Sequence, residues 1–72
     1  MAKFIKVESS NLAKVAYDLK AKLLSVQFDS GKVYNYEKVP YETVLELLFA
    51  ESVGKYFNTK IKDKFQLQQD NT

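Results

Sequence analysis

The alternation of hydrophobic and polar positions predicts β-strands in the first half of the chain. Residues 11–18 and 22–29 are short, rich in β-branched and aromatic side chains, and partly alternating. A short polar link between them is typical of a hairpin, and the turn at 29–31 leads into a third strand at 33–36. Residues 4–7 add a possible fourth strand at the edge. The pattern therefore predicts a three- or four-stranded antiparallel meander.

Helical spacing takes over after the sheet. Pro40 has a φ suited to the first position of a helix, and acidic residues follow it, as the N-terminal half of a helix prefers. Apolar residues then recur at helical spacing, namely Tyr41, Val44, Leu45, Leu48 and Phe49. We expect an amphipathic helix at 41–50. Ser52 is a good N-cap for a second short helix that runs to about Asn58.

The C-terminal segment alternates charged and apolar residues. Between positions 60 and 65, lysines and an aspartate surround Ile61 and Phe65. This alternation predicts an extended segment that lays two apolar anchors on the domain. Residues 66–72 are polar and predict a flexible tail. The predicted fold is α+β: an antiparallel meander covered on one face by two short C-terminal helices.

Tyr34 and Tyr36 are two positions apart on a strand and therefore share one face of the sheet. If the loop before them is 29–31, closed by Gly31 with positive φ, both rings fall on the face of Phe28 and belong to the core. If the loop is only residues 30–31, both rings project from the opposite face as a platform for stacking bases. We favour the longer loop, because it gathers the apolar side chains under the helices.

Composition removes most enzyme chemistry. The 72 residues include no cysteine, histidine, tryptophan or arginine, whereas 46% are hydrophobic. A folded, non-catalytic domain is expected, with no disulfide, metal site or cofactor. No apolar run is long enough for a signal peptide or membrane span, so we expect a cytoplasmic protein with no membrane partner.

Charge is distributed unevenly along the chain, although the net charge is only +2. Residues 1–36 carry six lysines against three acids, and residues 52–65 carry four lysines against one acid. Residues 37–51 have the opposite balance, with one lysine and four glutamates. One half of the domain is thus suited to face an anion while the acidic helix turns away.

Two candidate sites follow from this distribution. Ser52, Gly54 and Lys55 form the start of the second helix, where free N–H groups and a lysine can bind a phosphate. The alternative is that Gly54 only permits close helix packing. Lys60, Lys62 and Lys64 lie near Tyr56 in the sequence, a lysine–aromatic mixture typical of nucleic-acid binders. Solvated surface lysines and buried rings would give the same pattern.

The order of short motifs resembles the KTSC domain family. The matching pieces are Ser9-Ser10-Asn11, Tyr17-Asp18, residues 24–31, Val33-Tyr34-Asn35-Tyr36, Val39-Pro40, and residues 52–58 through Ile61-Lys62. The resemblance covers residues 8–65 and implies that 1–72 is a single domain. The family is named for a module at the C-terminus of some lysyl-tRNA synthetases, and it also occurs as stand-alone bacterial and phage proteins. Its synthetase association implies RNA binding, although this chain has lysines where the family often has arginines.

Two functions are consistent with these features. The first is a non-catalytic interaction domain of a small bacterial or phage accessory protein, which docks on a protein partner or on itself. The second is an RNA- or nucleic-acid-binding accessory domain that uses Ser52, Gly54 and the C-terminal lysines, with aromatic contacts from Tyr34, Tyr36 and Tyr56. The distribution of charge and aromatics is compatible with both.

Overall fold

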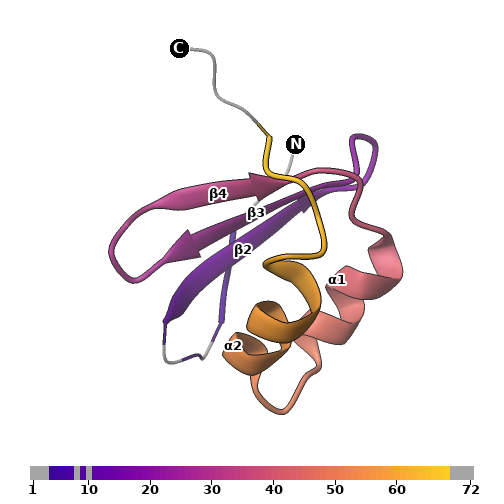
Figure 1. The fold of residues 1–72 in the computed structure, drawn as a ribbon. Helices are drawn as coiled ribbons and strands as arrows, with labels where there is room; N and C mark the ends of the chain where they lie inside the picture. Colours follow the sequence, from indigo (N-terminus) through magenta and orange to yellow (C-terminus); the bar gives the residue numbers. More distant parts are fainter. Residues whose placement is uncertain (1–3, 8, 10, 69–72) are drawn as a thin grey trace.

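The protein is a four-stranded antiparallel sheet followed by helices that cover one of its faces (Figure 1). The structure is a computed structural model that describes residues 4–7, 9 and 11–68. The sheet has the order β1-β2-β3-β4. Its elements are β1 (Ile5–Lys6), β2 (Leu12–Asp18), β3 (Leu23–Phe28), β4 (Val33–Tyr36), α1 (Tyr41–Leu48), α2 (Val53–Tyr56) and a π-helical turn (Phe57–Ile61). The predicted α+β meander with two C-terminal helices is confirmed. Within the described part of the chain, no helix is long and apolar enough to cross a membrane.

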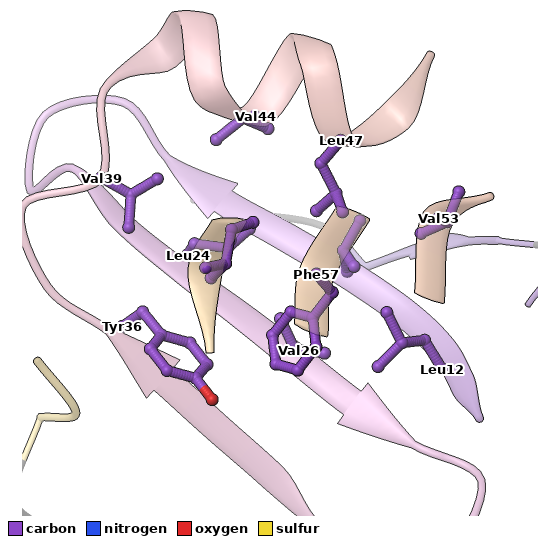
Figure 2. Packing of buried hydrophobic residues seen from close by; sticks show 11 residues of the cluster. Leu12, Leu24, Val26, Tyr36, Val39, Val44, Leu47, Val53 and Phe57 are labelled. Carbon is purple, nitrogen blue, oxygen red and sulfur yellow. The ribbon is translucent and has the colours of Figure 1, made fainter. Parts of the chain in front are cut away.

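The core lies between the sheet and the helices. Alternate side chains of β3 point inward, and Leu24 and Val26 are fully buried. Leu47 of α1 and Phe57 meet them from the opposite side (Figure 2). The helix α1 starts at Tyr41, as predicted, with Pro40 as its N-cap, and it ends at Leu48, two residues before the predicted end. Amphipathic patterning of both layers therefore produces one continuous apolar core.

The turn between β3 and β4 is the longer of the two predicted loops. The Phe28 N–H donates to the Lys32 carbonyl at 2.9 Å, and the Gly31 N–H donates to the Phe28 carbonyl at 2.9 Å. Gly31 has a φ of 95°, a conformation that side-chain-bearing residues rarely adopt. The register that follows pairs Val26 with Tyr34 and Leu24 with Tyr36. The three-residue loop is confirmed.

Both tyrosines lie on the helix-facing side of the sheet, but they differ in burial. Tyr36 is 4% exposed, as predicted for the core, whereas Tyr34 is 38% exposed. The prediction that both rings are core is wrong for Tyr34. The reason is the position of Phe57, whose ring packs edge-on against Phe28 and Tyr36 and leaves Tyr34 at the rim.

The C-terminal segment is helical where an extended segment was predicted. Residues 57–61 form a π-helical turn in which the Lys62 N–H donates to the Phe57 carbonyl at 2.9 Å. The Phe65 N–H then donates to the Ile61 carbonyl at 3.3 Å. Ile61 is fully buried and Phe65 packs against the core, so both anchors were identified correctly. Phe57, Ile61 and Phe65 are spaced four apart, a period that fits a helix as well as an alternating strand.

Residues 66–68 are paired with β4, so the prediction of a flexible tail is wrong for them. The Glu37 N–H donates to the Gln66 carbonyl at 2.8 Å, and the Gln68 N–H donates to the Asn35 carbonyl at 2.7 Å. The outer edge of β4 offers unpaired backbone groups, which these residues satisfy. Residues 69–72 of the predicted tail lie outside the described residues.

The difference in burial between the two tyrosines predicts a difference in stability. Tyr36→Ala should lower the free energy of unfolding by ~3–5 kcal/mol, because it empties a packed site under Phe57. Tyr34→Ala should cost roughly 1–2 kcal/mol, because much of its ring remains in water. Urea denaturation followed by circular dichroism measures both. Equal losses for the two variants would contradict the packing described here.

Candidate functional site

A groove of about 480 Å³ opens where the β3–β4 hairpin meets the C-terminal segment. Its size falls within the range of ~300–1,000 Å³ typical of small-ligand pockets. Three stretches of chain meet there: the start of β2, the hairpin, and the segment after α2. The lining residues are Asn11, Phe28, Ser30, Lys32, Tyr34, Tyr36, Asn58, Lys62, Asp63 and Leu67.

Aromatic rings form the apolar part of the groove. Phe28 and Tyr34 pack edge to face, with ring centroids 5.5 Å apart. The Phe57 ring packs edge-on against Phe28 and against Tyr36, with ring centroids 5.6 Å apart in each pair. Figure 2 shows Phe57 beside Tyr36 over the sheet. Such edge-to-face contacts hold the rings in defined orientations. Tyr34 is therefore a supported ring with an exposed surface.

The polar residues of the groove carry charge and hydrogen-bonding capacity. Lys32 lies in the hairpin and Lys62 in the C-terminal segment, and both are exposed. Asp63, which follows Lys62, also lines the groove. Burial, with smaller contributions from Tyr34 and Asp63, raises the pKa of the Tyr36 hydroxyl above its usual range. Tyr36 therefore stays protonated at neutral pH and can donate a hydrogen bond. Asn11 and Asn58 add amide donors and acceptors.

The structure separates the predicted site residues into groups. Lys62 lines the groove together with Tyr34 and Tyr36. Ser52, Lys55 and Tyr56 line a different, shallow hollow beside α2, together with Ala50, Glu51 and Thr59. Lys60 and Lys64 are exposed and line neither surface. The lysines that are close in sequence are thus not one patch around one site.

The turn from Ser52 to Lys55 has the geometry of a helix cap. The Ser52 hydroxyl oxygen accepts a hydrogen bond from the Lys55 N–H at 3.2 Å, and the Ser52 carbonyl accepts from the Tyr56 N–H at 3.0 Å. Gly54 is buried. These N–H groups already have partners, and the buried glycine fits the packing alternative. The anion site at this turn stays a prediction with little support from the geometry.

Tyr56 joins the two helices. Its hydroxyl donates to the Glu46 carboxylate at 2.5 Å, and Glu46 lies on α1. This hydrogen bond, helped by burial and by the negative charge of Glu46, raises the Tyr56 pKa to about 12. Tyr56 therefore holds α2 against α1, and its hydroxyl is occupied. This contact makes it a structural residue in this arrangement.

Some groove residues were missed from the sequence. Lys32 and Phe28 face each other across the predicted turn, so the same register that placed Tyr34 could have grouped them. Placing Asn58 and Asp63 in the groove required knowing that the chain stays helical after Asn58, whereas the alternating pattern at 60–65 predicted an extended segment. Within residues 4–7, 9 and 11–68, no three His, Cys, Asp or Glu side chains gather as metal ligands would. The groove can therefore act through stacking, hydrogen bonds and lysine charge.

Comparison with known proteins gives a consistent family assignment. The family model described as "KTSC domain" matches residues 8–65. An uncharacterized protein of Stutzerimonas stutzeri is 43% identical over 60 residues, which cover 83% of this chain and 84% of that protein. A KTSC domain protein of Yersinia pestis has a crystal structure that matches with a TM-score of 0.91 at 28% identity, covering 97% of this chain and 99% of that one.

Larger relatives carry the same region as a small part of their length. The lysine–tRNA ligase of Nostoc punctiforme is 42% identical over 65 residues, which cover 90% of this chain but 12% of the ligase. The corresponding enzyme of Trichormus variabilis is also 42% identical, over the same shares of the two chains. This chain therefore corresponds to one small module of those enzymes.

The contact between Tyr56 and Glu46 predicts a shifted titration. The hydrogen bond requires the protonated phenol, and the pKa of that phenol is raised from 10.0 to about 12. Its contribution to stability is therefore complete below the unfolded-state pKa and is lost as the pH rises through about 12. Phenolate absorbance should show a late tyrosine titration that Tyr56→Phe removes. If Tyr56 titrates at its ordinary value, the contact is absent in solution.

Proposed function

The chain belongs to the KTSC domain family. We propose that its function is non-catalytic, namely that it binds single-stranded RNA in the groove between the β3–β4 hairpin and the C-terminal segment. One observation carries this proposal. The exposed Tyr34 ring, supported by Phe28, lies in the same groove as Lys32 and Lys62. A stacking surface beside two positive charges matches the chemistry of an RNA strand.

The aromatic part of the groove suits an unpaired base. Proteins that bind single strands stack bases on rings, and each such contact is worth ~1–3 kcal/mol. Tyr34 is 38% exposed and is held edge-on by Phe28. A base that stacks on Tyr34 covers apolar surface that is now in water. Double-stranded RNA keeps its bases stacked on one another, so a single strand is the form that this ring fits.

The lysines suit the backbone of the strand. Lys32 and Lys62 reach the groove from two different segments and can contact successive phosphates. A lysine contacts phosphate as a point charge, without the two-pronged geometry of arginine. The chain has no arginine, so we expect charge attraction with little sequence preference. With two phosphate contacts, the logarithm of affinity should fall with the logarithm of salt with a slope of about −1.4.

The remaining polar groups suit base edges and ribose. The protonated Tyr36 hydroxyl and the Asn11 and Asn58 amides can donate to base carbonyl groups. Asp63 weakens the local positive charge, which argues against a site for phosphate alone. Its carboxylate can instead accept a hydrogen bond from a base amino group or a ribose 2′-hydroxyl. That acceptor gives the groove a means of preferring RNA over DNA.

The family relationship supports the same ligand. Lysine–tRNA ligases of Nostoc punctiforme and Trichormus variabilis contain a region similar to this chain. By their names, those enzymes act on a tRNA, and the region that is similar to this chain is part of them. Because this chain matches 12% of the Nostoc ligase, the likeness concerns this module and not aminoacylation.

A binding titration tests the proposal. A fluorescein-labelled, unstructured RNA of about ten nucleotides lies within the site sizes of ~4–16 nucleotides known for small single-strand binders. Fluorescence anisotropy at several salt concentrations should show binding that weakens as salt rises. Tyr34→Ala should weaken it by about 5- to 150-fold, the equivalent of one lost stacking contact. Lys62→Glu should weaken it and make the salt slope shallower by about 0.7.

Matched variants separate the groove from general charge. Lys64→Glu makes the same charge change as Lys62→Glu outside the groove, so RNA binding should be nearly unchanged. Val33→Ala removes an exposed side chain from the opposite face of β4, and it should also be neutral. Circular dichroism confirms that each variant is folded. Equal losses for Lys62→Glu and Lys64→Glu, or no binding at low salt, would exclude the groove as an RNA site.

A further inference from the structure

A second surface lies on the outer side of α1, away from the groove. Tyr41, Leu45 and Phe49 follow one another at a spacing of four residues along this helix. Tyr41 is 50% exposed and Phe49 is 84% exposed, while Leu45 is half-buried. We refer to these three residues as the α1 stripe. Single exposed apolar residues are ordinary, but three in a line on one helix are a contiguous surface.

The α1 stripe is separate from the part of the helix that packs on the sheet. Val44 and Leu47 are the buried residues of α1, and Figure 2 shows both directed toward the sheet. With about 100° of rotation per residue, the apolar positions of α1 span more than half of its circumference. One core needs an apolar sector of roughly 100°. In the described part of the chain, the additional sector contributes no residue to the core, although its Tyr41 stacks on Tyr17.

The continuation of the helix beyond Leu48 keeps Phe49 in line with the stripe. The Phe49 N–H still donates to the Leu45 carbonyl at 3.0 Å. At the other end, the Tyr41 ring stacks on Tyr17, with centroids 6.2 Å apart, which limits its movement. The Tyr41 end of the stripe is therefore held in place, which lowers the entropic cost of docking a partner on that ring.

The charge on α1 itself is negative, although Lys6 lines a hollow with Leu48, Ala50 and Glu51 near the Phe49 end of the stripe. Glu42 and Glu46 lie along its border on the same helix, and Glu51 follows shortly after it. Residues 39–54 contain no lysine, although the whole chain has 11. One border of the apolar stripe is thus acidic, in a chain whose net charge is positive. Opposite charge around an apolar centre favours encounter with a partner and selects its orientation.

We propose that the α1 stripe is a docking surface for a basic segment of a protein partner. This segment carries apolar side chains at helical spacing and lysines or arginines beside them. The apolar side chains cover Tyr41, Leu45 and Phe49, and the positive charges face Glu42 and Glu46. A helix of this kind packs on α1 by fitting its ridges between these side chains. RNA is repelled by the same glutamates, so the two surfaces bind different classes of ligand.

The most lysine-rich segment of a second copy of this chain, residues 52–65, fits the stripe less well, because its apolar residues are committed to its own core. Phe57 and Ile61 are fully buried, and Phe65 packs against the core. That segment therefore presents positive charge without apolar anchors. A different chain can present both on one face. Exposed apolar side chains do lie beside lysines elsewhere in this chain, at Ile5 and Leu19, so the oligomeric state is part of the test below.

Selection from a random peptide library displayed on phage, with the folded protein as bait, tests this proposal. Enriched peptides should be positively charged and should carry apolar residues three or four positions apart. Binding of a synthetic copy of the best peptide should weaken at least about tenfold in Phe49→Ser, because an exposed aromatic anchor is removed. Glu42→Lys should weaken it as well. RNA binding should be unchanged in Phe49→Ser, so the two proposals can fail separately.

A matched variant and a size measurement complete the test. Leu19→Ser removes another exposed apolar side chain, 64% exposed and outside the stripe, and it should leave peptide affinity unchanged. Enrichment of acidic peptides, no enrichment, or equal binding to Phe49→Ser and the parent would overturn the proposal. Light scattering that shows a dimer of the parent and a monomer of Phe49→Ser would also overturn it, because a second copy would then be the occupant.

Discussion

The register of the β3–β4 hairpin is the constraint on which the rest of the structure depends. Gly31, with a φ of 95°, closes a three-residue turn that sets Phe28 opposite Lys32. This pairing places Tyr34 and Tyr36 on the helix-facing side of the sheet. A slip of one residue would move both rings to the other face, because side chains alternate along a strand. The core would then lose Tyr36, and the groove would lose its stacking ring.

Phe57 determines how this register shapes the groove. Its ring is fully buried and packs edge-on against Phe28 and Tyr36, so it closes the core at those two positions. Tyr34 remains at the rim, supported but partly exposed. The π-helical turn that begins at Phe57 then carries Asn58 and Lys62 to the other wall of the groove. Core packing and the proposed RNA contact are consequences of the same few aromatic residues.

The strands, the first helix and the β3–β4 hairpin could be predicted from the sequence, whereas the C-terminal half of the candidate site could not. Strand alternation and the Gly31 turn are local signals, so the meander and the register were predicted correctly. Residues 60–65 were predicted as extended, because apolar residues four apart fit both a strand and a helix. The pairing of residues 66–68 with β4 uses backbone groups, which leave no pattern in the side chains. The groove joins three distant segments, and only the folded chain brings them together.

Chemical-shift mapping of the folded protein, titrated with unlabelled single-stranded RNA, tests the central claim most directly. The amide signals that shift should be those around Asn11, Lys32, Tyr34 and Lys62, which line the groove. The signals of α1 should remain in place, because that helix lies outside the groove and is bordered by glutamates. Shifts confined to α1 or to the hollow beside α2, or no shifts at low salt, would contradict the assignment of this groove as the RNA site.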